Sequence, residues 1–168
     1  MRYAQIRKMD ISNGEGIGVS LFVQGCHFHC KGCFNQETWD FNGGKEWDEQ
    51  TEREFISLAS PDYIKRISIL GGEPLADENI AAVSKLIRRL KEIYPEKMIW
   101  IYTGYTWDTL DAYGKLRFIQ DADVLVDGQF QLDKQDLFNK YIVFAGSTNQ
   151  RIIDVQASIA NEEIVYWR

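Results

Sequence analysis

The 168-residue sequence has only three cysteines, an odd number, and they are confined to one short segment. A disulfide framework would use an even number of cysteines spread along the chain, so that class of small secreted protein is excluded. No apolar run approaches the roughly 20 residues that span a bilayer, and the polar first residues lack the apolar core of a signal peptide. We therefore expect a cytoplasmic protein with no membrane partner, whose reduced, adjacent thiols bind a metal.

Basic residues are also fewer than acidic ones: the chain has 19 Lys and Arg and 25 Asp and Glu, for a net charge of −6. This balance gives no electrostatic basis for general nucleic-acid binding. The sequence lacks repeats, low-complexity tracts and Pro-, Gly- or Ser-rich linkers. With an apolar fraction of 45%, it predicts one globular domain over residues 1–168.

Strand-like and helical segments alternate along the chain. Short β-branched and aromatic runs predict strands at 16–24, 66–70, 98–102, 123–126 and 141–144. Capping residues and apolar periodicity predict helices from Asp48 to about residue 59, over 76–94 and near 106–113. This alternation indicates an α/β fold with a mainly parallel sheet, in which the loops after successive strands meet at one edge. The cysteines, Gly71-Gly72, Thr103-Gly104 and Asp127-Gly128 all occupy such loops.

The cysteine loop has the spacing C-x3-C-x2-C, formed by Cys26, Cys30 and Cys33. Thiolates are the usual ligands of iron–sulfur clusters, and a cubane normally takes four. Three thiolates leave one iron of a [4Fe–4S] cluster without a protein ligand. The amino and carboxylate groups of S-adenosylmethionine could chelate that iron, and an electron from the cluster could then break a C–S bond.

Other interpretations of this loop remain open. A structural zinc site would need a fourth ligand from His27 or His29, although each adjoins a cysteine and would have to fold back awkwardly. A dithiol redox motif would leave Cys26 without a role. A simple iron–sulfur electron carrier would explain the thiols but not their number. We interpret the two histidines as solvated loop residues.

The segment Gly71-Gly72-Glu73-Pro74 lies between a predicted strand and a predicted helix. Its glycines permit close approach of a ligand to the backbone, whose free carbonyls would accept bonds from an ammonium group. Glu73 would add a charge-assisted bond, and Pro74 would fix the start of the helix. Phe34 or Trp39, after the cysteines, could stack on an adenine or screen a cluster, although packing in the core is as good an explanation.

Together these segments resemble the radical S-adenosylmethionine superfamily, whose signature is C-x3-C-x2-C. Within it, the sequence is most similar to the family of anaerobic ribonucleoside-triphosphate reductase-activating proteins. Five stretches carry this likeness: 26–44 (CHFHCKGCFNQETWDFNGG), 70–75 (LGGEPL), 102–110 (YTGYTWDTL), 124–130 (VLVDGQF) and 146–156 (GSTNQRIIDVQ). One departure is Ala145, where the family pattern has an arginine, so an anion contact from that position is not expected.

The resemblance implies a partial, open βα barrel of the radical-SAM type that holds a [4Fe–4S] cluster on its three cysteines. It implies that S-adenosylmethionine contacts a set of residues at the strand ends: Gly32, Cys33, Phe34, Gly71, Gly72, Glu73, Pro74, Thr103 and Asp127. In related activating enzymes a threonine and an aspartate at comparable strand ends help to hold a cation, a role that would fall to Thr103 and Asp127.

The resemblance also implies a partner. The radical made at the cluster would take a hydrogen from a glycine in the large chain of the anaerobic reductase, with a flavodoxin-type protein as electron donor. The chain length agrees with a protein substrate, because a closed eight-stranded barrel needs about 250 residues and an open one must be covered by something else. The alternatives are an activase of another glycyl-radical enzyme, such as pyruvate formate-lyase, and a radical enzyme acting on a small molecule.

Overall fold

The computed structural model describes residues 1–136 and 144–168, which form one sheet with helices packed against it. The strands are β1 (Arg2–Asp10), β2 (Gly18–Val23), β3 (Lys45–Glu46), β4 (Arg66–Gly71), β5 (Met98–Tyr102), β6 (Val124–Asp127) and β7 (Arg151–Asp154). The α-helices are α1 (Glu49–Leu58), α2 (Ile80–Ile93), α3 (Trp107–Ala112) and α4 (Val155–Asn161). In these ranges no helix is long and apolar enough to cross a membrane.

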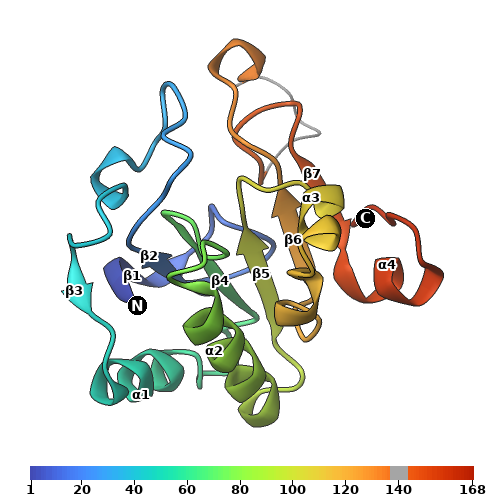
Figure 1. Ribbon diagram of the computed structural model, residues 1–168. Helices are drawn as coiled ribbons and strands as arrows, with labels where there is room; N and C mark the ends of the chain where they lie inside the picture. Colours follow the sequence, from blue (N-terminus) through green and yellow to red (C-terminus); the bar gives the residue numbers. More distant parts are fainter. Residues whose placement is uncertain (137–143) are drawn as a thin grey trace.

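The sheet has seven strands in the order β3-β1-β2-β4-β5-β6-β7 (Figure 1). Its four central strands, β2, β4, β5 and β6, run parallel, whereas β1, β3 and β7 pair antiparallel at the two sides. Among the described residues, β3 and β7 pair with no further strand of this sheet, so the sheet is open at both sides. The predicted α/β class and the parallel sheet are therefore confirmed for the central strands.

Most predicted elements match the structure closely, and the differences have local causes. The strand over 98–102 and the Asp48 cap of α1 lie where expected. Helix α2 begins at Ile80 rather than at residue 76, because residues 76–79 form turns in which the Asn79 side chain donates to backbone carbonyls of Gln24 and Glu73. The strand predicted at 141–144 falls mainly on residues 141–143, outside the described residues.

The strands β1, β3 and β7 and the helix α4 were not predicted. β1 is largely exposed and lacks an apolar run, and β3 and β7 are only two and four residues long. Such short or polar strands form because a neighbouring strand supplies the hydrogen-bonding partner, which a local sequence pattern does not record.

The two faces of the sheet carry different cores. On one face the side chains of the central strands pack against α1, α2 and α3 in the main hydrophobic core, with Leu21, Ile69 and Ile101 fully buried. On the other, inner face a smaller cluster forms around Trp100, Val124 and Val126. This inner face also carries the cavity described below, which makes it the functional side of the sheet.

Candidate functional site

The cysteine loop begins where β2 ends, and backbone contacts fix its entry. The amide of Gly25 donates to the carbonyl of Thr38 (2.7 Å) and that of Cys26 to the carbonyl of Trp39 (3.1 Å). Gly25 has a φ of 99°, and a Cβ there would collide with the ring of Phe41, so glycine is required at this turn. The loop is thus folded back on the segment that follows it and presents its thiols to one side.

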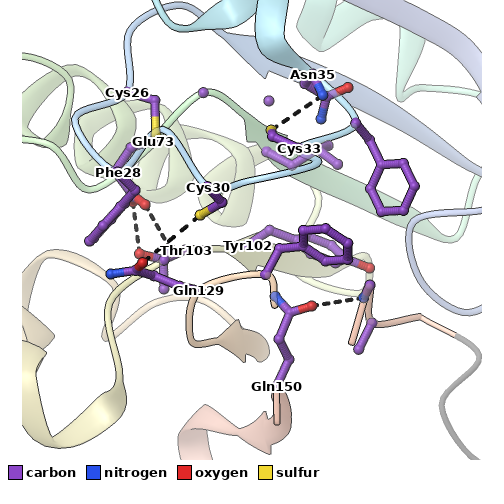
Figure 2. A pocket seen from close by; sticks show the side chains of 18 of the residues that line it. Cys26, Phe28, Cys30, Cys33, Asn35, Glu73, Tyr102, Thr103, Gln129 and Gln150 are labelled. Atoms are coloured by element: carbon purple, nitrogen blue, oxygen red, sulfur yellow. Dashed lines mark hydrogen bonds between the residues drawn. The ribbon is translucent and has the colours of Figure 1, made fainter. Parts of the chain in front are cut away.

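All three thiols line one cavity of about 660 Å³ on the inner face of the sheet. Figure 2 shows Cys26, Cys30 and Cys33 along one wall, with the Cys33 sulfur accepting from the amide of Asn35 (3.4 Å). Burial raises the pKa of the Cys26 and Cys30 thiols, so a bound cation would be needed to hold them as thiolates at neutral pH.

The thiols are not arranged for a single ion. Within the described residues, no three His, Cys, Asp or Glu side chains converge as ligands of one metal ion. In a cubane, by contrast, each cysteine binds a different iron, so the sulfurs must stand apart. The donor set therefore fits an iron–sulfur cluster better than mononuclear zinc.

The two histidines of the loop are exposed and are not among the residues that line the cavity. His27 makes a 2.8 Å contact with Glu78 and lies against the ring of Phe41. His29, with a φ of 47°, stacks on Trp39 at 4.4 Å between ring centroids. They are surface residues as interpreted from the sequence, but each has a defined partner that shapes the loop.

The glycine turn after β4 packs directly against the cysteine loop. The amide of Glu73 donates to the carbonyl of Gly25 (2.7 Å), and a Cβ on Gly72 would collide with that carbonyl oxygen. Gly71 has a φ of 108° and lies over the backbone of Phe22. Both glycines line the cavity, as predicted, but their lack of a side chain is already required by the approach of these two loops.

The carboxylate of Glu73 connects the ends of β4 and β5 beneath the cavity. It is 2% exposed and accepts from the Thr103 hydroxyl (2.7 Å, Figure 2), the Gly104 amide (2.7 Å) and the Leu75 amide (2.9 Å). Burial raises the pKa of this carboxyl to about 7, against the lowering effect of the three donors. The side chain is therefore poised between its charged and neutral forms near neutral pH.

Of the remaining residues that were predicted to contact the cofactor, some line the cavity and others do not. Cys33, Phe34 and Thr103 line the cavity, whereas Gly32, Pro74 and Asp127 lie outside its lining. Asp127 is 1% exposed; its oxygens accept from the backbone amide of Trp107 (2.7 Å) and from the Arg151 guanidinium (3.0 and 2.5 Å). In this structure the Thr103 hydroxyl donates to Glu73 and Asp127 pairs with Arg151, so a cation role for the two side chains stays a prediction.

Sequence reasoning missed several residues of the cavity wall. Tyr102 ends β5 and Gln129 follows the turn after β6, with its oxygen 4.0 Å from the Cys30 sulfur. Tyr102 lies next to the predicted Thr103, and Gln129 lies two residues after the predicted Asp127, so these nearby positions were the signal. Phe130, directly after Gln129, also lines the cavity, and other lining residues come from more distant parts of the chain: Arg7, Ser12, Asn13 and Gln150.

Two polar atoms in the cavity wall have no hydrogen-bond partner among the described residues. Within the described part of the chain, the Tyr102 hydroxyl and the Trp39 indole N–H are buried without a hydrogen bond. Unpaired buried polar groups are costly, and in a cavity wall a bound ligand or water can supply the missing partner. Together with the three thiols and the glycine turn, they fit a cavity that holds a cluster and a polar organic cofactor.

Comparisons with known proteins agree with this geometry. A family model described as a 4Fe-4S single cluster domain matches residues 12–153. The anaerobic ribonucleoside-triphosphate reductase-activating protein of Pasteurella multocida (strain Pm70) is 39% identical over 155 residues, covering 90% of this chain and 96% of its own. The proteins of the same name from Escherichia coli (strain K12) and Enterobacteria phage T4 are 39% and 36% identical, covering 89% and 90% of this chain and 96% and 93% of their own.

Proposed function

Because the chain belongs to the family of anaerobic ribonucleoside-triphosphate reductase-activating proteins, we propose that it is a radical S-adenosylmethionine enzyme that creates the glycyl radical of that reductase. The observation that carries the proposal is the placement of Cys26, Cys30 and Cys33 on one wall of a cavity that also includes the glycine turn after β4. Neither an electron carrier nor a zinc protein needs both features.

Cys26, Cys30 and Cys33 hold the [4Fe–4S] cluster and leave one iron free for the cofactor. When bound, the cluster and S-adenosylmethionine supply a primary radical by reductive cleavage of the sulfonium. The Gly71-Gly72 turn and Glu73 border the space next to the thiols, so they are placed to receive the ammonium group. Phe28, Phe34 and Trp39 surround the same space with aromatic rings and exclude water from it.

Other predicted residues position their neighbours. The hydroxyl of Thr103 orients Glu73, and Pro74 and Gly32 shape the turns that carry their neighbours. Asp127 ties the amino end of α3 to β6 and to Arg151 of β7, which keeps the strand ends of the cavity in register. We assign Asp127 this positioning role in place of a direct contact with the cofactor.

The open sheet supports a partial barrel of the radical-SAM type, built as a single domain from residues 1–168. Its uncovered inner face would be closed by the large chain of the reductase, which presents the glycine. A flavodoxin-type protein in the cytoplasm is our candidate electron donor, because the cluster must be reduced before each cleavage.

The test is anaerobic activation of the reductase. With reductant and S-adenosylmethionine, electron paramagnetic resonance should show a doublet on the reductase that collapses to a singlet when its glycines are deuterated at the α-carbon. A doublet on pyruvate formate-lyase but not on the reductase would identify another activase, and cofactor cleavage with no protein radical would favour a small-molecule substrate.

The ligand assignment has its own test. Cys26→Ala, Cys30→Ala and Cys33→Ala should each lose the visible absorption of the reconstituted cluster and give no radical signal, because three thiolates are the minimum for this site. A variant that kept a full cluster and full activity would remove that cysteine from the ligand set.

A further inference from the structure

A charged pair is buried at the amino ends of the parallel strands, far along the chain from the cysteines. Arg66 begins β4 and its side chain is fully buried. Its guanidinium donates to the backbone carbonyls of Asp10 (2.6 Å), Asn13 (2.7 Å) and Glu15 (3.2 Å). Its charge is balanced by the Asp10 carboxylate, 3.7 Å away. One arginine thus fixes three points of the loop between β1 and β2.

Asp10 holds the same loop from the other side. Its carboxylate accepts from the amides of Ser12 (2.7 Å) and Asn13 (3.1 Å), from the Asn13 side chain (2.5 Å) and from the hydroxyl of Ser20 (2.6 Å). Gly14 packs on the arginine, since a Cβ there would collide with the side chain of Arg66. Both members of the buried pair therefore use most of their hydrogen-bonding capacity on residues 10–15.

The loop buries too little apolar surface to explain why a buried ion pair holds it. Ile11, Ser12 and Glu15 are exposed, and the side chain of Ile11 is 75% exposed. A buried ion pair rarely adds net stability, because the loss of hydration offsets the attraction between the charges. What the pair contributes here is a single conformation for a surface loop.

The fixed loop forms part of the functional cavity. Ser12 and Asn13 line it together with the cysteines, although the loop precedes β2 and the cysteines follow it. A strand of this length separates its two ends by about 17 Å, so the loop lies well away from the thiols. Exposed apolar side chains lie near both regions: Met9 and Ile11 are beside the loop, and Phe34 is beside Cys33. Such side chains around an open cavity suit a polypeptide partner.

We propose that Arg66, paired with Asp10, is a positioning residue that holds residues 11–13 as a docking contact for the reductase segment that enters the cavity. This inference rests on the proposed function and adds to it a second contact region, remote from the cluster. Ser12 and Asn13 offer polar groups in a fixed geometry to the entering backbone, and Ile11 offers an apolar side chain at the rim.

Arg66→Lys tests the positioning role. Lysine keeps the charge but cannot bind three carbonyls as a guanidinium does. We expect the cluster content, and the rate of 5′-deoxyadenosine release without reductase, to stay within about twofold of wild type. The reductase concentration that gives half-maximal radical should rise about tenfold, which corresponds to about 1.4 kcal/mol. Equal losses in cleavage and in radical formation would overturn the inference.

Lys97→Met is the matched control. Lys97 is also a buried cation, 4% exposed, and it donates to the carbonyls of Ala59 and Pro61 at the end of α1, outside the cavity. The Lys97→Met substitution should lower the free energy of unfolding, but the reductase concentration that gives half-maximal radical should stay the same. Amide hydrogen exchange gives a readout free of catalysis: residues 11–15 should exchange faster in Arg66→Lys and not in Lys97→Met. Unchanged exchange in Arg66→Lys would refute the positioning role.

Ile11→Asp tests the docking contact itself, and the substituted side chain lies outside the hydrophobic core. Because this side chain is exposed, the variant should fold, cleave S-adenosylmethionine normally and need about tenfold more reductase. Tyr113→Asp, at a 69% exposed position outside the cavity lining, should behave as wild type. Equal behaviour of both variants would refute the contact. If wild type itself forms no radical on the reductase, the proposed function fails, and the exchange measurement still decides the role of Arg66.

Discussion

At the scale of single residues, the cavity wall contains side chains whose pKa values are shifted by burial. Glu73 accepts three hydrogen bonds that favour its carboxylate, yet burial still raises its pKa to about 7. Tyr102 carries a hydroxyl with no partner among the described residues, and burial raises its pKa as well. Both properties lead to measurable effects in the cluster-free protein.

Glu73 should make stability fall with rising pH. Its folded pKa of about 7 exceeds the reference value of 4.5, so the folded chain binds the proton more tightly than the unfolded chain. The free energy of unfolding should therefore decline by about 3 kcal/mol as pH rises from 4.5 to 7 and stay level above that range. Glu73→Gln removes this decline, which urea titrations across the pH range would show.

A control for this measurement is Glu49→Gln, at a side chain that is 92% exposed, which should keep the wild-type pH profile. A Glu73→Gln protein that retained the whole decline would show that another group causes it. Bound S-adenosylmethionine should reduce the decline, because a nearby ammonium group favours the carboxylate.

Tyr102→Phe should separate stability from binding. Removing a buried hydroxyl that lacks a partner should raise the free energy of unfolding of the cluster-free protein by about 1 kcal/mol. In the cluster-loaded protein the same change should weaken S-adenosylmethionine binding, measured by calorimetric titration, because the hydroxyl would then lack its ligand. A less stable cluster-free variant would mean that the hydroxyl is already paired.

At the scale of elements, the loops at the carboxyl ends of β2, β4 and β5 are tied to one another by hydrogen bonds. The carbonyl of Gly25 receives the Glu73 amide, and the Glu73 carboxylate receives the Thr103 hydroxyl and the Gly104 amide. The cysteine loop is consequently held by the glycine turn, and a change in the turn should affect the cluster as well as the cofactor.

Gly72→Ala should therefore impair cluster binding. Its Cβ would meet the carbonyl oxygen of Gly25, next to Cys26, and would push the two loops apart. We expect lower iron content and reduced visible absorption after reconstitution, with weaker cofactor binding as a consequence. Gly114→Ala is a suitable control for added bulk, because a Cβ there meets nothing within 4 Å, although its φ of 65° adds some strain. Normal cluster content in Gly72→Ala would show that the loops can separate.

At the scale of the whole molecule, the C-terminal segment helps to close the amino end of the inner face. The ring of Trp167 packs on the fully buried Trp100, its backbone amide donates to Ile152 of β7, and its indole donates to Glu15. Residues 165–167 therefore cover part of edge strand β7 and touch the loop that Arg66 holds.

Trp167→Ala should destabilise the fold without changing the cluster site. Loss of a partly buried indole and its contacts should lower the free energy of unfolding by about 2 kcal/mol, less than for a fully buried tryptophan. Denaturant titration measures this loss, and cluster absorption should remain at the wild-type level. Loss of the cluster in this variant would show that the two ends of the cavity are coupled.

The sequence by itself determined the local elements and the chemistry of the cysteine loop. Helix α1 was predicted because Asp48 can cap an amide three residues ahead, a relation contained in a short stretch of chain, and the structure shows the same kind of cap from Thr106 at the start of the predicted helix α3. The central strands followed from compact apolar runs, and the spacing of Cys26, Cys30 and Cys33 predicted them as cluster ligands. The family resemblance drawn from the same segments is confirmed by the relatives.

Only the tertiary structure decided how the cavity wall is held. The partners of Glu73, Asp127 and Arg66 lie up to 56 residues away in sequence, as in the bond from Arg66 to the Asp10 carbonyl. No local periodicity encodes such pairs, because they depend on which strands become neighbours in the sheet. For the same reason Asp127 was predicted as a cofactor contact, whereas the folded chain places Arg151 of the adjacent strand against it and leaves it outside the cavity lining.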